Sequence, residues 1–245
     1  MEKKETKTVK KAESTQSKLT KAEEKSKATT LRIVSAVLWL VAIACEVLAI
    51  LDITQALYLP GGQLLWAIIF IVLDLGCCIA ASQLWKKASF LDPFKKTNNQ
   101  FWFAVLNQLG VIMAAICFLP LIIVLFTDKN KLDKKSKIIV TVIAIVALLI
   151  AGLFGANFNP ISAEEKEAAE ATFTDTVYWS AFGHKYHLSD NCQAIRNSVT
   201  VYDGTVQDAI DAGRSELCAF CARDAEKAGT DLTGINVEET TVPVE

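Results

Sequence analysis

The chain has 245 residues, of which 52% are hydrophobic, and its net charge is −2. This composition excludes an ordinary soluble domain, because the apolar residues are gathered into blocks long enough to cross a lipid bilayer. The two ends carry opposite charge: residues 1–30 hold nine Lys against five Glu, whereas residues 160–245 hold six Lys or Arg against sixteen Asp or Glu. Because so acidic a tail would repel phosphate, nucleic acid is disfavoured as its partner.

The N-terminal residues 1–30 are rich in Lys, Glu, Thr and Ser and contain almost no large apolar side chains. Such a segment cannot bury enough surface to offset its ordering entropy, so we expect a disordered, Lys-rich tail. Under the positive-inside rule, its lysines and Arg32 place the N-terminus in the cytoplasm.

Four apolar blocks follow this tail. They cover approximately residues 33–59, 63–85, 101–126 and 138–157. Each reaches the ~20 residues that an α-helix needs to cross a ~30 Å hydrocarbon layer. The sequence therefore predicts an all-α membrane bundle of about four transmembrane helices in a domain over 31–158, embedded in the lipid bilayer and followed by a small C-terminal α+β zinc-knuckle domain.

The lysines of the loops leave two topologies open. Those of the second loop favour the cytoplasm: Lys86, Lys87, Lys95 and Lys96. A third full crossing would then place the lysines of the third loop outside: Lys129, Lys131, Lys134, Lys135 and Lys137. The alternative is a re-entrant block 101–126, broken at Gly110 or Pro120, with an extracytoplasmic C-terminus. Since re-entrant backbone needs other protein groups to satisfy it, we expect four crossings and a cytoplasmic C-terminal module.

Polar side chains interrupt the apolar blocks. Glu46 and Asp74 lie well inside the first and second blocks, and Asn107 and Gln108 lie near the start of the third. An ionisable group at this depth costs about 2.5–3.5 kcal/mol on insertion, so each is a candidate functional residue. The four could line a polar path for an ion or small solute. The alternative, which we favour, is that they make polar contacts between helices.

After the last block the composition changes to that of a small separate domain. We expect an acidic linker over 159–171, a module over 172–230 and a flexible acidic tail over 231–245. Within the module, Val177-Tyr178-Trp179 and Val199 to Tyr202 are typical of strands. A helix that starts with the capping-box pattern Thr205 to Asp208 and ends at Gly213 follows them.

Four metal-ligand side chains occur in this module with the spacing His-x4-Cys-x25-Cys-x2-Cys: His187, Cys192, Cys218 and Cys221. Thiolate and imidazole are ligands that Zn²⁺ prefers, and four protein ligands fill a tetrahedron without leaving a position for substrate. We therefore predict a structural zinc site. Four alternatives stay open: His184 as the fourth ligand, a redox-active Cys218/Cys221 pair, a disulfide if the module is outside, and a soft metal other than zinc.

The spacing also carries a family resemblance. The pattern Gly183-x-x-Tyr186-His187-x4-Cys192, the helix end Ala209-x3-Gly213 and Cys218-x2-Cys221 resemble the small zinc-binding modules related to the zinc domain of the Ada DNA-repair protein. Such modules are found at the ends of many bacterial secreted, nuclease and membrane proteins, and the resemblance covers residues 177–227. The Ada domain uses four cysteines, one of which accepts a methyl group. Here His187 stands in the corresponding place, which argues against that activity.

These patterns favour a non-enzymatic bacterial-type integral membrane protein that anchors a zinc-binding interaction or sensing module. They show no general acid/base pair, Ser-His-Asp order or phosphate loop. We expect the partner to be a protein or a surface polymer. One alternative is a small transporter or channel component that uses Glu46 and Asp74, with the module as a metal-sensing regulator. The other is a membrane-bound thiol oxidoreductase that uses Cys218 and Cys221.

Overall fold

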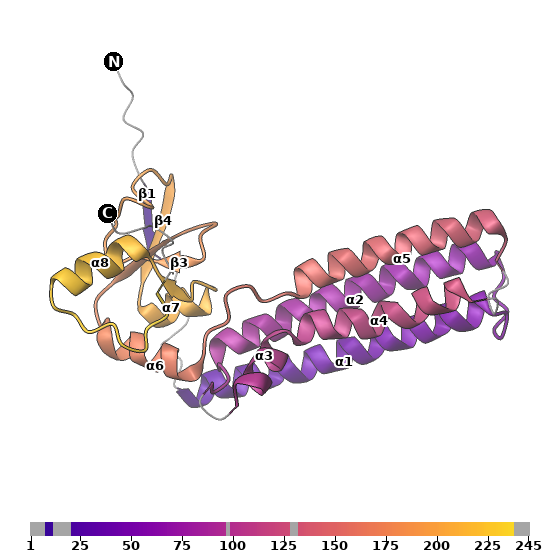
Figure 1. Ribbon diagram of the computed structural model, residues 1–245, viewed down its shortest axis with the longest axis horizontal. Helices are drawn as coiled ribbons and strands as arrows, with labels where there is room; N and C mark the ends of the chain where they lie inside the picture. The colour runs from indigo at the N-terminus through magenta and orange to yellow at the C-terminus, as the bar shows by residue number, and fades with distance from the viewer. Residues whose placement is uncertain (1–7, 12–20, 97–98, 128–131, 238–245) are drawn as a thin grey trace, which may run out of the picture. The chain divides into compact units, whose positions relative to one another are not determined.

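The computed structural model describes residues 8–11, 21–96, 99–127 and 132–237. The chain divides into two compact units (Figure 1). The first, called here the bundle unit, consists of residues 29–88 and 104–158. The second, the module unit, combines residues 1–28, 89–103 and 159–245.

Four long helices supply the bundle: α1 (Lys21–Ile53), α2 (Gln63–Leu91), α4 (Leu109–Phe126) and α5 (Lys134–Gly155). All four are long and apolar enough to cross a membrane. The shortest, α4, has 18 residues, which corresponds to roughly 27 Å of helix. The predicted fold class is confirmed: the chain is mostly helical, with four candidate membrane helices and a small C-terminal region of short strands and helices.

The bundle has small residues inside and large apolar residues outside. Its buried positions include Ala42, Ala81, Ala114, Ala144 and Ala151. Large side chains such as Leu40, Ile123 and Leu149 are exposed. Lipid tails are as apolar as these side chains, so burying the side chains between helices gives no hydrophobic stabilisation. Helices in a membrane associate instead through small residues that allow close backbone packing. The closest approach joins α4 and α5, where a Cβ atom on Gly110 would lie 2.6 Å from the carbonyl oxygen of Gly155.

The third apolar block is not one helix. It is divided between α3 (Gln100–Asn107) and α4, with Gln108 as the N-cap of α4 at φ −98° and ψ 13°. Further along, Pro120 lies inside α4, where it has no N–H to donate. The neighbouring N–H of Leu121 donates to Glu46 Oε1 at 3.0 Å. A carboxylate of α1 thus bonds to the backbone of this block beside its proline.

Both ends of the chain are more regular than the sequence suggested. Residues 8–11 form β1 (Thr8–Lys11), and residues 21–30 form the first turns of α1. Extending an existing helix costs less than nucleating one, and this segment contains good helix formers. Residues 1–7 and 12–20 of the expected disordered tail lie outside the described residues, as do 238–245 of the expected C-terminal tail. Of that tail, Asn236 accepts a backbone hydrogen bond from Leu217 at 2.8 Å.

The module unit is built from short elements (Figure 1). Besides β1 they are α6 (Ala163–Thr172), β2 (Val177–Ser180), β3 (Lys185–Tyr186), β4 (Thr200–Gly204), α7 (Val206–Asp211), β5 (Glu216–Leu217) and α8 (Ala219–Lys227). One sheet has the order β1-β4-β2, with β4 parallel to β1 and antiparallel to β2, and the other pairs β3 with β5 in parallel. The core between them includes Val177, Trp179, Tyr186, Val201, Ile210 and Leu217.

Local sequence fixes the helix ends in this unit. Ser162 and Glu165 form a capping box at the start of α6, and Thr205 and Asp208 form one at the start of α7. Each box satisfies N–H groups that would otherwise have no partner in the helix. Gly213 follows α7 with φ +82°, a conformation that favours glycine. These signals turn the chain back toward β5 and toward Cys218 and Cys221.

Candidate metal centre

The four predicted ligands lie together in the module unit. One ligand atom from each of His187, Cys192, Cys218 and Cys221 falls within 4.8 Å of all the others, and all four side chains are buried. The Sγ atoms of Cys192 and Cys218 are 3.9 Å apart. Four sulfur ligands about 2.3 Å from a tetrahedral zinc ion would be separated by about 3.8 Å. The distance between these two sulfur atoms therefore matches that of a tetrahedral site.

Backbone pairing brings these side chains together from two distant segments. His187 exchanges two backbone hydrogen bonds with Tyr178, of 2.7 and 2.8 Å, which fix it beside β2. The backbone N–H of Cys218 donates to the carbonyl of Tyr186 at 3.1 Å, so the two segments meet one residue away from His187. Cys218 is also the N-cap of α8, which places Cys221 in the first turn of that helix.

Backbone N–H groups point at the sulfur atoms. Leu188 N–H donates to Cys221 Sγ, with 3.4 Å between the heavy atoms. The N–H groups of Phe220 and Cys221 interact with Cys218, and that of Ala194 with Cys192. These donors, together with the positive end of the α8 dipole, stabilise negative charge on sulfur. The site is thus arranged for thiolates, which are the form of cysteine that binds metal.

The two thiols of the Cys-x2-Cys turn differ strongly in acidity. The hydrogen bond from Cys221 is the main reason why the pKa of Cys218 is lowered to about 3, with His187 and the backbone N–H groups contributing less. The same hydrogen bond, together with burial, raises the pKa of Cys221. The pair therefore shares one proton. A metal ion bound to both sulfurs would replace that proton.

The imidazole of His187 also fits a metal ligand. Its buried Nδ1 atom has no hydrogen-bond partner within the part of the chain that the structure describes. His184, in contrast, is exposed and is not a member of the cluster. All seven cysteines are free thiols, including the three in the cluster. The cluster could therefore hold a metal ion.

A groove of about 540 Å³, which was not predicted from the sequence, lies beside the cluster. Cys192 and Cys221 form part of its wall. The remaining lining is polar or charged apart from Phe220: Ser189, Asn191, Gln193, Phe220, Arg223, Asp224 and Lys227. The guanidinium of Arg223 lies 5.0 Å from the centre of the Phe220 ring. The volume is within the range of about 300–1,000 Å³ that is usual for ligand sites.

The polar residues of the membrane helices fall into two places in the bundle unit. Gln108 exchanges hydrogen bonds with the backbone of Asn157 at 2.7 and 3.3 Å, and Asn107 accepts one from the Asn157 side chain at 3.3 Å. Glu46 instead accepts a hydrogen bond from the backbone N–H of Leu121. Leu121 is separated from Gln108 by roughly 20 Å of helix. The four predicted residues therefore do not form one site.

Asp74 belongs to the Glu46 end of the bundle. It is buried and lies close enough to Glu46 for their charges to interact, and within hydrogen-bonding reach of Cys117. Its Oδ1 atom has no hydrogen-bond partner among residues 8–11, 21–96, 99–127 and 132–237.

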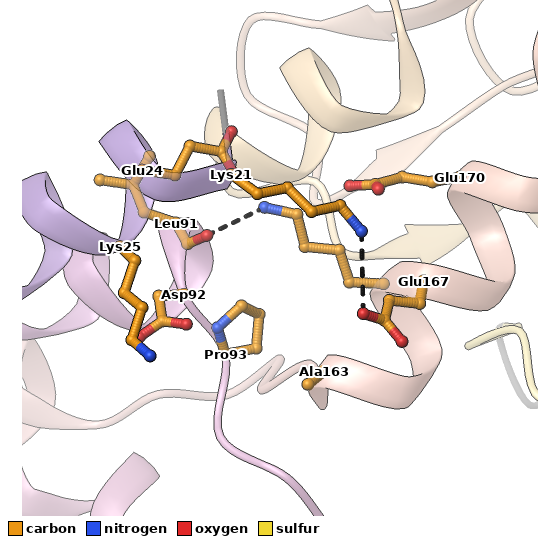
Figure 2. A pocket seen from close by; sticks show the side chains of 10 residues that line it. Lys21, Glu24, Lys25, Leu91, Asp92, Pro93, Ala163, Glu167 and Glu170 are labelled. Atoms are coloured by element: carbon orange, nitrogen blue, oxygen red, sulfur yellow. Dashed lines mark hydrogen bonds and ion pairs between the residues drawn. The ribbon is translucent and has the colours of Figure 1, made fainter. Parts of the chain in front are cut away.

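A buried lysine holds a second polar cluster together, within the module unit. Lys166 Nζ donates to the carbonyls of Phe90 at 3.2 Å and Leu91 at 3.1 Å, and bonds to Asp211 Oδ1 at 3.2 Å. Cations are favoured at such helix C-termini. Burial raises the pKa of Asp211, and the charge of Lys166 opposes that rise. A cavity of about 110 Å³ lies beside this cluster, next to the exposed ion pair of Lys21 with Glu167 (Figure 2).

Comparison of the chain with protein-family models, curated proteins and solved structures gave no match. The fold and the cluster together define the class of the protein. It is a protein with four helices suited to span a membrane and a His/Cys cluster that could hold a metal ion.

Proposed function

We propose that the protein is a non-enzymatic, bacterial-type membrane protein whose helices anchor a zinc-stabilised interaction module. The anchor corresponds to residues 31–158 and the module to 172–230. The module is related to the Ada-like zinc domains that its spacing resembles, and its partner is a protein or a surface polymer. The cluster of four buried ligand atoms within 4.8 Å is the observation that carries this proposal.

The donor set favours zinc and a structural role. Three thiolates and one imidazole suit Zn²⁺, which has no geometric preference of its own and takes a tetrahedron readily. The bound ion would have all four positions filled by protein. A catalytic zinc keeps one position for water or substrate, so the closed set supports recognition over hydrolysis.

The size of the module supports the same role. Its strands have two to five residues, and three of the four ligands belong to its apolar core. A domain of this size has little core of its own, so a metal ion commonly supplies much of its folding free energy. The groove lined by Phe220 and Arg223 then offers a surface for the partner.

The charge distribution bears on location. The lysines of the N-terminal arm and of the second loop favour the cytoplasm, and four crossings place the module on that side as well.

Metal analysis of the full-length protein tests the proposal. The protein, purified in detergent without chelator, should carry about one zinc ion per chain, as expected for a closed four-ligand site. The Cys218→Ser variant should lose it, and Cys45→Ser, which changes a half-buried cysteine of α1, should not. Metal-free wild-type protein, equal zinc in both variants, or iron in place of zinc would each contradict the proposal.

A transporter is the second candidate, because Asp74 is a buried acid with an oxygen that lacks a partner within the described residues. Its charge-neutral variant Asp74→Asn separates the two functions. Partner binding should be unchanged in this variant if the protein is an anchor, whereas ion or solute flux in proteoliposomes should be lost if it is a transporter.

A thiol oxidoreductase is the third candidate function, because Cys218 is a thiol of low pKa that is hydrogen-bonded to Cys221. Such an enzyme needs the two cysteines but no metal. Thiol–disulfide exchange that persists in His187→Ala would support it, and loss of exchange in that variant would count against it.

A further inference from the structure

Two large apolar side chains stand exposed at one end of the β1-β4-β2 sheet. Phe182 is 96% exposed and Val199 is 70% exposed. The last residue pair of the antiparallel β2–β4 ladder is Ser180 with Val201. Phe182 lies two residues after Ser180, and Val199 two residues before Val201, so both extend from the same end. They are called here the Phe182–Val199 patch.

The loop that carries Phe182 is fixed by hydrogen bonds. Gly183 N–H donates to Ser180 Oγ at 3.1 Å. Arg214 Nη2 donates to the carbonyls of Ser180 at 3.1 Å and Ala181 at 2.7 Å, on the residues directly before Phe182. The aromatic ring is therefore held in solvent by an ordered backbone. Ordering a loop in advance reduces the entropy lost when its side chains bind.

The charge around the patch differs from that of the rest of the C-terminal tail. Residues 176–202 contain Lys185, Arg196 and a single acid, Asp190. The rest of 160–245 contains fifteen acids against four Lys or Arg. The segment 176–202, which carries both side chains of the patch, is thus the stretch of this tail that an anionic surface repels least.

The module unit is covalently linked to the helices proposed to span the membrane. Only 21 residues separate the end of α5 at Gly155 from the start of β2 at Val177. Fully extended, they would span at most about 70 Å, which keeps the module at a high effective concentration near the bilayer. An aromatic ring with a neighbouring aliphatic side chain and a cation is suited to the interface between headgroups and acyl chains.

We propose that the Phe182–Val199 patch docks on an anionic lipid surface, with Phe182 inserted at the interface and Arg196, which is exposed and lies three residues before Val199, at lipid phosphates. This docking would hold the module against the membrane and orient its groove. It depends on the membrane anchoring of the chain but not on the identity of the metal.

Photocrosslinking from Phe182 tests the docking in the full-length protein. Benzoylphenylalanine replaces Phe182 in protein reconstituted into phosphatidylcholine vesicles with or without phosphatidylglycerol. Illumination should give a lipid adduct, seen as a lipid-sized mass increase in the intact protein. The same probe at Ala228, the exposed C-cap of α8, is the control and should give little adduct.

A charge variant makes the test specific. Arg196→Gln should lower the yield of lipid adduct at position 182 about fivefold in the anionic vesicles, as expected for the loss of one cation near the surface. Adduct to a second protein in native membranes, no adduct at position 182, or equal yields at 182 and 228 would overturn the proposal. Zinc content, measured on each variant, shows separately whether the metal module is intact.

Discussion

Replacement of Gly110 by Ala tests whether close packing of α4 and α5 holds the bundle. The new Cβ would lie 2.6 Å from the carbonyl oxygen and 2.9 Å from the Cα atom of Gly155. Ordinary van der Waals contact begins at 3.4 Å, so the helices would have to move apart by the difference, about 0.8 Å. The obstacle is backbone on both sides and cannot turn away. Overpacking of this kind costs about 1–3 kcal/mol.

Gly152→Ala is the matched control, because it lies in α5 and an added Cβ meets nothing within 4 Å. Both variants gain the same helix propensity, about 0.5–1 kcal/mol, so the difference between them measures the overpacking alone. Unfolding by sodium dodecyl sulfate in mixed micelles, followed by circular dichroism, should rank Gly152→Ala above wild type and Gly110→Ala below it. If the two variants were equally stable, the close contact would not contribute and the packing argument would be refuted.

Three further predictions concern the module unit. Lys166→Met should destabilise it by about 1–3 kcal/mol, because it leaves a half-buried carboxylate and two carbonyls without their cation; thermal unfolding should show a much smaller effect for the exposed Lys25→Met. His187→Ala should weaken zinc retention against a chelator, whereas His184→Ala, at an exposed position, should not. Metal affinity should fall as the pH is lowered, since protons compete for three thiolates and an imidazole; chelator titrations that show no change between pH 7.5 and about pH 5 would contradict the ligand set.

Hydropathy and ligand spacing were enough to predict the features with a local signal. The four membrane helices follow from apolar blocks, and α7 follows from its capping box and Gly213. The cluster of His187 and the three cysteines could be recognised because metal ligands are few residue types in a characteristic spacing. In each case the information lies within a short stretch of sequence or in a rare residue type.

The features that were missed depend on residues far apart in the chain. Lys166 bonds to residues 45 and 75 or 76 positions away, and no pattern near it distinguishes it from a surface lysine. The pairing of β1 with β4 likewise joins the N-terminal arm to the module, although the composition of the arm predicts disorder. Asn157 was overlooked because its partners, Asn107 and Gln108, lie about fifty residues earlier. Such contacts arise from the tertiary fold and leave no periodic pattern in the amino-acid sequence.

The two units depend on different interactions, and this difference suits an anchor that carries a recognition module. In the bundle, alanines and glycines bring helix backbones together, so its association needs no metal. In the module, the ligands tie β3 to the start of α8 and also form part of the core and the wall of the groove. Under the proposed function, loss of the ion would therefore disturb the groove and leave the membrane helices in place. The proposed closed metal site would give the protein a binding surface whose integrity follows metal supply while its anchorage does not.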